Sequence, residues 1–218
     1  MTGSDHNGAL VLASASPRRA EILGAAGIEF NIVPTDIDED ALLPGPGSHA
    51  DAVQRLALEK AKTVAGLAPG SFVLGADTIV VLDGHILGKP DSPGHAVEML
   101  HRMSGRKHNV ITGVAVVGPD GESQTVFVST SVLMREFEDV EIADYVATGS
   151  SLDKAGGYGI QDSSFAPVKR YDGCYLNVVG LPMCATVELL ESTGLSMPGD
   201  AMCQGHGRSE AIGMKAPR

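Results

Sequence analysis

The sequence has no long apolar run, few cysteines and few basic residues, and each shortage excludes a class of protein. No run approaches the roughly 20 apolar residues that span a bilayer. The N-terminus also lacks the basic-then-apolar order of a signal peptide, so we expect a soluble, cytoplasmic protein without a membrane partner. The three cysteines, Cys174, Cys184 and Cys203, are odd in number and lack CxxC spacing, which argues against a disulfide framework and a zinc site.

Basic residues are outnumbered, since 16 Lys and Arg against 27 Asp and Glu give a formal net charge of -11. General binding of nucleic acid requires a basic face, so we expect no nucleic-acid partner. None of the seven histidines shows i,i+4 ligand spacing or a HExxH pattern, which argues against a dedicated histidine metal site. An anionic ligand must therefore be bound by local basic residues.

Alternating strand and helix patterns predict an α/β protein. The turn sequences Asp83-Gly84, Pro119-Asp120-Gly121 and Asp172-Gly173 predict hairpins, so the sheet should be mixed. Residues 1–8 and 194–218 lack apolar periodicity and are predicted to be flexible tails around a single domain, 9–193. The expected strands are 9–13, 28–33, 71–82, 108–117, 123–134, 165–171 and 174–180. The expected helices are 17–26, 49–66, 93–103, 138–148 and 182–192.

The stretch Ser14-Ala15-Ser16-Pro17-Arg18-Arg19 has the signals of a helix start but the wrong charges. A capping serine and a proline at the first helical position are typical of a helix N-terminus. The helix dipole there normally attracts acidic residues, yet this first turn has two arginines. We infer an anion site in which the ligand supplies the missing negative charge.

Two lysines can extend this site. Lys60 falls within the apolar stripe of helix 49–66, where it either places its ammonium in water along the core or binds the anion. Lys89, in Gly88-Lys89-Pro90, is either an exposed hairpin lysine or one that reaches Asp77. If both contribute, the ligand carries several phosphates.

Asp77 interrupts the apolar strand 71–82 and is followed by Thr78. Burial of an unpaired carboxylate costs several kcal/mol, so Asp77 needs a cation, a hydrogen-bond network or a water-lined cleft. It could cap a neighbouring element or mark a bulge at Gly75. We favour a functional role as a general base or a metal ligand.

Two loops offer further ligand groups. The acidic run 36–40 is either solvated surface or a source of hard oxygen ligands for Mg²⁺ bound with phosphate. Three glycines in 152–161 allow close backbone approach to a ligand. The amide of Gln161 both donates and accepts hydrogen bonds, which suits recognition of a base edge.

An ordered set of motifs resembles the Maf nucleotide pyrophosphatases over roughly residues 9–192. The motifs are Ser14-Ala15-Ser16-Pro17-Arg18-Arg19, Glu59-Lys60-Ala61-Lys62, Gly75-Ala76-Asp77-Thr78, Gly88-Lys89-Pro90, Asp153-Lys154-Ala155-Gly156-Gly157-Tyr158-Gly159-Ile160-Gln161 and Val179-Gly180-Leu181-Pro182. The resemblance implies an elongated mixed sheet flanked by helices, two lobes around a deep cleft, and a homodimer. It also implies hydrolysis of nucleoside triphosphates to the monophosphate and pyrophosphate with a divalent metal, Mg²⁺ or Mn²⁺.

The resemblance also assigns residues. It implies that Asp77 is the proton acceptor for water and a metal ligand, with Glu39 assisting at the metal. The phosphate-binding residues it implies are Ser14, Arg18, Arg19, Lys60 and Lys89. The dTTP and UTP pyrophosphatase type has Arg, Thr and Gln at three selectivity positions, which fall on Arg18, Thr78 and Gln161.

Alternatives stay open at this point. Asp162 stands where the family often has glycine, which could alter the base pocket, and 195–218 extend beyond the usual end. A non-catalytic nucleotide-binding regulator of cell division would use the same basic residues without needing Asp77. Modified pyrimidine nucleotides are also possible substrates, because the recognised edge leaves the 5-position of the ring unspecified.

Overall fold

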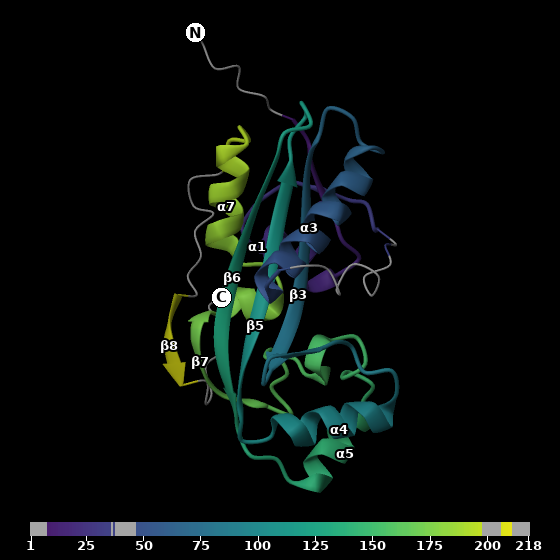
Figure 1. The fold of residues 1–218 in the computed structure, drawn as a ribbon, viewed down its shortest axis with the longest axis vertical. Coiled ribbons are helices and arrows are strands. Elements are labelled where there is room, and N and C mark those ends of the chain that lie inside the picture. Colours follow the sequence, from purple (N-terminus) through teal and green to yellow (C-terminus); the bar gives the residue numbers. More distant parts are fainter. Residues whose placement is uncertain (1–7, 36, 38–46, 198–205, 211–218) are drawn as a thin grey trace. The chain divides into compact units, whose positions relative to one another are not determined.

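The computed structural model describes residues 8–35, 37, 47–197 and 206–210 (Figure 1). Within these residues, eight strands form one sheet in the order β2-β1-β3-β5-β6-β7-β8, with β4 paired to β3. β1 runs parallel to β2 and β3, whereas β4 is antiparallel to β3 and β7 is antiparallel to β6. The predicted mixed sheet with flanking helices is therefore confirmed.

Most elements begin and end close to their predicted positions. The strands are β1 (Leu10–Ala13), β2 (Asn31–Ile32), β3 (Phe72–Leu82), β4 (His85–Leu87), β5 (Lys107–Val117), β6 (Ser123–Met134), β7 (Val168–Cys174) and β8 (His206–Glu210). The helices are α1 (Pro17–Ala25), α3 (His49–Ala65), α4 (Pro93–Met103), α5 (Asp139–Ala147), α6 (Tyr175–Val179) and α7 (Met183–Ser192), with a 3-10 turn η1 (Ala155–Gly157).

Contacts between residues divide the chain into two compact units. Among the described residues, the first unit contains the chain up to Asp77, Thr112–Val128 and the residues from Gly180 to 197. The second contains Thr78–Ile111, Ser129–Val179 and β8. The deep cleft implied by the family resemblance stays a prediction.

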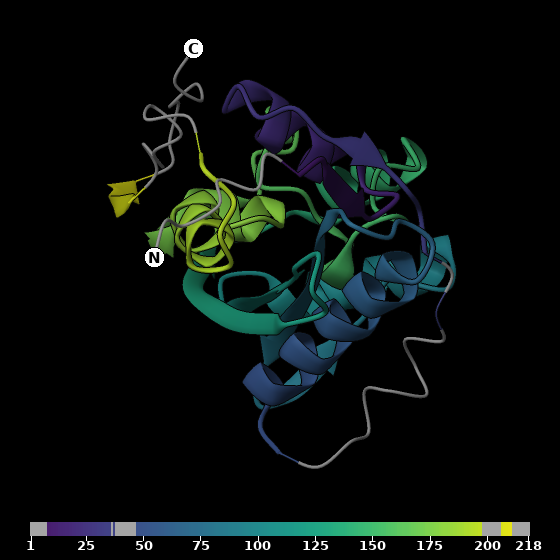
Figure 2. The same cartoon turned by 90° about the horizontal axis from the view of Figure 1, so that it is seen from above.

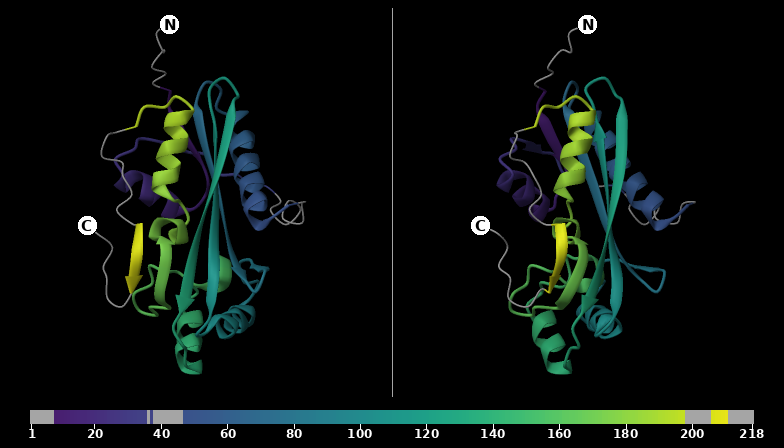
Figure 3. Two further views of the ribbon diagram at one scale, coloured as in Figure 1. Left: turned by 60° about the vertical axis from the view of Figure 1, so that its left-hand side comes forward. Right: turned by 90° about the vertical axis from the view of Figure 1, so that its left-hand side faces the viewer.

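Helix α3 lies very close to two strands of the first unit. A Cβ atom at Gly75 of β3 would lie 2.2 Å from the carbonyl oxygen of Ala57, and one at Gly113 of β5 would lie 2.4 Å from that of Val53. Only glycine allows helix backbone to approach strand backbone this closely. Figure 2 and Figure 3 show α3 on one face of these strands and α7 on the other.

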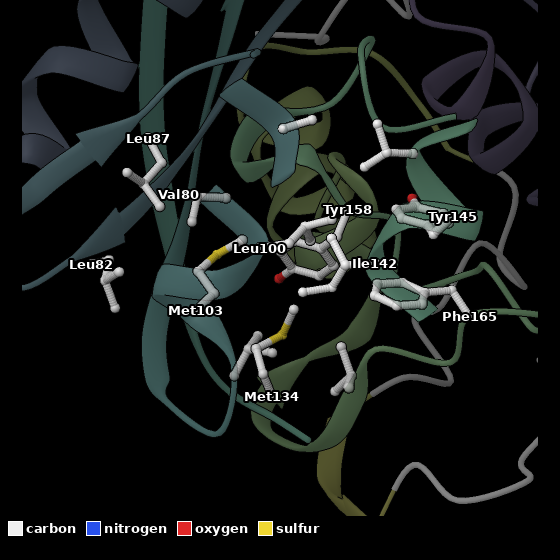
Figure 4. Close-up of a cluster of buried hydrophobic side chains, with 14 of the residues drawn as sticks. Val80, Leu82, Leu87, Leu100, Met103, Met134, Ile142, Tyr145, Tyr158 and Phe165 are labelled. Carbon is white, nitrogen blue, oxygen red and sulfur yellow. The ribbon is translucent and has the colours of Figure 1, made fainter. Parts of the chain in front are cut away.

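The second unit has its own apolar core, in which α4 and α5 contribute most of the large helical side chains. Figure 4 shows Leu100 and Met103 of α4 close to Ile142 of α5 and to Tyr158. The ring of Phe165 stacks on that of Tyr145 at a centroid distance of 4.2 Å. This core fixes the segment that follows η1.

The turn Asp83-Gly84 joins β3 to β4 as predicted. Both residues have positive φ, 52° and 77°, the conformation that a two-residue hairpin turn requires. Asp-Gly is one of the pairs that adopt it at low cost, which is why this turn could be predicted from the sequence.

The predicted strand 174–180 is wrong, because residues Tyr175–Val179 form helix α6. The fully buried Asn177 of this helix donates hydrogen bonds through Nδ2 to the carbonyl oxygen of Val110 and to Oγ1 of Thr130. Burial of an amide is tolerated when such partners exist, and they come from β5 and β6, far away in the sequence. The predicted turn Asp172-Gly173 is likewise wrong, since both residues lie within β7.

Residues 206–210, within the segment predicted as a C-terminal tail, form β8 along β7. Among the residues that the structure describes, none of the helices has both the length and the hydrophobicity required to cross a membrane.

Candidate active site

The N-terminus of α1 lacks the groups that normally satisfy a helix start. Pro17 occupies the first helical position as predicted, but the side chain of the N-cap residue Ser16 makes no capping hydrogen bond. The first turn contains no acidic residue and holds the half-buried Arg18 and Arg19 instead. The helix dipole and two guanidinium groups therefore add up to a positive field that favours an anion.

Arg19 is held in place by two hydrogen bonds. Its Nε donates to the carbonyl oxygen of Gly180 at 2.9 Å, and its Nη1 donates to Oγ of Ser14 at 3.1 Å. Ser14 Oγ also accepts from the backbone N–H of Ser16 at 3.2 Å. Ser14 and Arg19, predicted as phosphate ligands from their motif, are thus in direct contact.

Lys60 and Asp77 form a buried ion pair. Lys60 Nζ lies 2.6 Å from Asp77 Oδ1, and each side chain is only 8% exposed. The sequence left two interpretations of Lys60 open, and in one of them the ammonium extended into bulk water. The burial of the pair excludes that interpretation. Removal of one partner from such a pair usually costs about 3–5 kcal/mol, because the other charge is left uncompensated.

The close approach of α3 at Gly75 explains how this pair forms. Gly75 and Asp77 point to the same face of β3, because strand side chains alternate. Lys60 lies one helical position before Ala61, whose backbone also contacts Gly75. The helix is therefore near enough for Lys60 to reach the carboxylate.

Parallel pairing of β1 with β3 brings the segment that leads into α1 close to Asp77. β1 pairs with β3 so that Ala13 stands opposite Gly75. Because the strands are parallel, the residues that follow Ala13, beginning with Ser14, continue toward Ala76 and Asp77 of β3. The end of β1, which leads into α1, consequently lies beside the middle of β3, where the buried carboxylate is, within the same unit.

Three further predicted residues, Thr78, Lys89 and Gln161, lie in the second unit. Thr78 is half-buried in β3, Lys89 is exposed just after β4, and Gln161 is exposed beyond η1. A Cβ atom at Gly156 would lie 3.2 Å from the methyl groups of Val80. Because Thr78 and Val80 share one face of β3, the segment that leads to Gln161 packs against the face carrying Thr78.

Asp162, which departs from the usual family glycine, stabilises a turn. Its Oδ1 accepts hydrogen bonds from the backbone N–H groups of Ser164 and Phe165, both at 3.1 Å. The hydroxyl of Ser164 donates to the same oxygen at 2.8 Å. This oxygen is therefore engaged in the turn that follows Gln161.

Glu39, predicted to assist at a metal, lies outside the described residues. Within the part of the chain that the structure covers, no group of three or more His, Cys, Asp and Glu residues could hold a metal ion. Among the described residues of the predicted site, Asp77 alone offers a buried carboxylate. Mg²⁺ is often bound by one or two carboxylates together with substrate phosphates, so this donor set fits a cation that binds with a nucleotide.

Comparison with known proteins identifies the family. Residues 9–193 match the family described as "Maf-like protein". The chain belongs to the Maf family.

Three Maf relatives named "dTTP/UTP pyrophosphatase" are similar over most of their lengths. That of Citrifermentans bemidjiense is 48% identical over 86% of this chain and 97% of its own. Those of Moorella thermoacetica and Geobacillus sp. are 49% and 47% identical, over 87% and 85% of this chain and 97% and 98% of theirs.

Among solved structures, the Staphylococcus aureus Ham1 protein is similar at a TM-score of 0.42 and 15% identity, over 58% of this chain and 72% of that one. This similarity is too low to support an inference. The Maf assignment therefore depends on the sequence match alone.

Sequence reasoning missed two features of this Maf chain. The motif containing Gly180 was recognised without a role, and the structure shows its carbonyl oxygen holding Arg19. The buried contact between His108 and Tyr158 had no signal beyond a tyrosine in the glycine-rich segment, because the two residues are 50 positions apart.

Proposed function

We propose that this Maf protein hydrolyses nucleoside triphosphates, dTTP and UTP above all, to the monophosphate and pyrophosphate. The observation that carries the proposal is the buried Asp77, a carboxylate paired with Lys60 in the middle of β3, the strand that lies next to the one leading into α1. The relatives' names support the choice of dTTP and UTP.

In the proposed reaction, Asp77 accepts a proton from a water molecule as the water oxygen attacks the α-phosphorus. The bond between that phosphorus and its bridging oxygen to the β-phosphate breaks, and pyrophosphate leaves. General-base assistance of this kind contributes about 10²–10⁴ in rate. Lys60, which has three donor hydrogens, can keep Asp77 in place while also donating to a phosphate oxygen.

The proposed role of Ser14, Arg18, Arg19 and Lys89 is to bind the triphosphate. Guanidinium groups form charge-assisted, often bidentate hydrogen bonds to phosphate, and the positive end of the α1 dipole adds to the attraction. Such binding positions the α-phosphorus for attack and neutralises charge that builds up on the leaving pyrophosphate.

A divalent cation, Mg²⁺ or Mn²⁺, is part of the proposal, held by Asp77, by phosphate oxygens and by Glu39. When bound, it would supply Lewis-acid stabilisation of phosphate charge. The selectivity residues are proposed to be Arg18, Thr78 and Gln161, because a hydroxyl and an amide can satisfy the donors and acceptors on the edge of uracil or thymine.

We also propose that the protein is a homodimer and that it acts in the cytoplasm. Light scattering on the purified protein gives its mass in solution, and a monomer at working concentration would contradict the dimer.

The reaction is tested with purified protein, Mg²⁺ or Mn²⁺, and a panel of dTTP, UTP, CTP, GTP and ATP. We expect pyrophosphate without orthophosphate, released fastest from dTTP and UTP. In H₂¹⁸O, the label should appear in the monophosphate, since attack at the α-phosphorus leaves the water oxygen there. Orthophosphate would indicate a different phosphatase, and binding without any release would favour the regulator.

The phosphate-binding role of Arg19 predicts a specific kinetic change. We expect Arg19→Lys to raise KM for UTP about tenfold, because lysine keeps the charge but cannot reproduce both hydrogen bonds of the guanidinium group. Arg170→Lys, at an exposed position of β7, is the control and should leave KM unchanged. Equal KM values for the two variants would remove Arg19 from the binding site.

A further inference from the structure

His108 and Tyr158 form a polar contact inside the apolar core of the second unit. His108 Nε2 and the Tyr158 hydroxyl are 2.7 Å apart, and the two rings meet edge to face at an 80° angle. His108 is 2% exposed and Tyr158 is 5% exposed. Figure 4 shows Tyr158 close to Leu100 and Ile142 within this core.

The His108–Tyr158 contact is less favourable in free energy than apolar packing at the same place in the core would be. Burial lowers the pKa of His108 to about 4, so the imidazole is neutral near pH 7. Within the described part of the chain, its Nδ1 is buried without a hydrogen-bond partner. A polar atom buried in this way costs free energy that two apolar side chains would not. What the contact provides instead is a directional link between β5 and the segment after η1.

That segment is held at several points on either side of Gln161. The backbone N–H of Gly156 donates to the carbonyl oxygen of Gly88 at 2.9 Å. Gly156 has φ of +71°, which favours glycine, and it packs on Val80. Asp162 stabilises the turn on the other side of Gln161.

Among the side-chain hydrogen bonds described before Gln161, the His108–Tyr158 contact is the one closest to it in the sequence. Tyr158 precedes Gln161 by three residues, and Gln161 itself is exposed. An exposed amide can select a base only if the backbone that carries it is held in a fixed position, because a loosely held group adapts to the wrong ligand.

We propose that His108 is a positioning residue for nucleobase selection: through Tyr158 it fixes the backbone that presents Gln161 to the pyrimidine edge. The inference rests on the proposed function and adds to it a residue outside the motifs that carry the family resemblance. His108 itself touches neither nucleotide nor reacting atoms in this role. It acts on the preference between uracil and cytosine, which differ at the edge that an amide reads.

The test compares kcat/KM for UTP and CTP in four variants. Tyr158→Phe removes only the hydroxyl and keeps the ring, and His108→Phe removes the imidazole. We expect each to lower the UTP preference about tenfold, the usual size of one buried hydrogen bond lost, mainly through a higher KM for UTP. kcat should change far less, because Asp77 is untouched. His108→Gln restores a polar atom near the position of Nε2 and should recover most of the preference.

Tyr175→Phe is the matched control, since it removes another partly buried tyrosine hydroxyl in the same unit. Its UTP preference should equal that of the wild type. Wild-type release of pyrophosphate from UTP, combined with unchanged preference in folded Tyr158→Phe and His108→Phe, would overturn the positioning role and leave the proposed function intact. A wild type that releases no pyrophosphate from any nucleotide would overturn both.

Discussion

Asp77→Asn is expected to lower kcat for pyrophosphate release from UTP at least about a hundredfold, because an asparagine side chain cannot accept the proton of the attacking water. UTP binding should remain measurable, since the arginines at α1 are unchanged. Turnover is measured by the pyrophosphate released under saturating UTP. Thermal unfolding is followed in parallel, because the buried ammonium of Lys60 loses its compensating charge and stability falls.

Asp83→Asn is the control for this substitution. Asp83 lies in the β3–β4 turn with its side chain 57% exposed, and it pairs with Arg106 on the surface. Asparagine tolerates the positive φ of 52° found there, so the turn should be preserved. We expect wild-type kcat in this variant. A folded Asp77→Asn protein with the same kcat would exclude Asp77 as the general base.

Gly75→Ala is expected to destabilise the protein by about 3 kcal/mol or more, the upper range for a residue forced into a packed core. The added methyl group would lie 2.2 Å from the carbonyl oxygen of Ala57 and 2.9 Å from the backbone nitrogen of Ala61. Both atoms belong to helix backbone, so the conflict is relieved only by movement of α3 away from β3. That movement would also separate Lys60 from Asp77, so activity should fall together with stability.

Urea unfolding measures this effect directly. Gly24→Ala is the control, because Gly24 lies in α1 and, apart from its chain neighbours and its own helix backbone, no atom of the described residues lies within 4 Å of the added Cβ atom. Alanine is favoured over glycine in a helix by up to about 1 kcal/mol, so the control should be as stable as the wild type or more stable. If both variants unfolded at the same urea concentration, the close packing of α3 on β3 would be refuted.

Local sequence patterns were sufficient for much of the fold and for part of the site. The Asp83-Gly84 hairpin depends on the conformational preferences of its own two residues. Helix α1 begins at Pro17 because a proline is favourable at that single position. The need of Asp77 for a compensating partner was likewise predictable from a charge placed inside an apolar strand.

Local patterns along the chain were enough to predict the alternation of strands and helices, the Maf motifs and the unusual positive charge at the start of α1, because each depends on neighbouring residues. The pairs of groups that meet became known from the folded chain: Lys60 with Asp77, Arg19 with Gly180, and His108 with Tyr158. The tertiary structure also made 175–179 a helix, since the partners of Asn177 come from other strands. These contacts join residues 17 to 161 positions apart, and their energy depends on packing and burial that no local pattern contains.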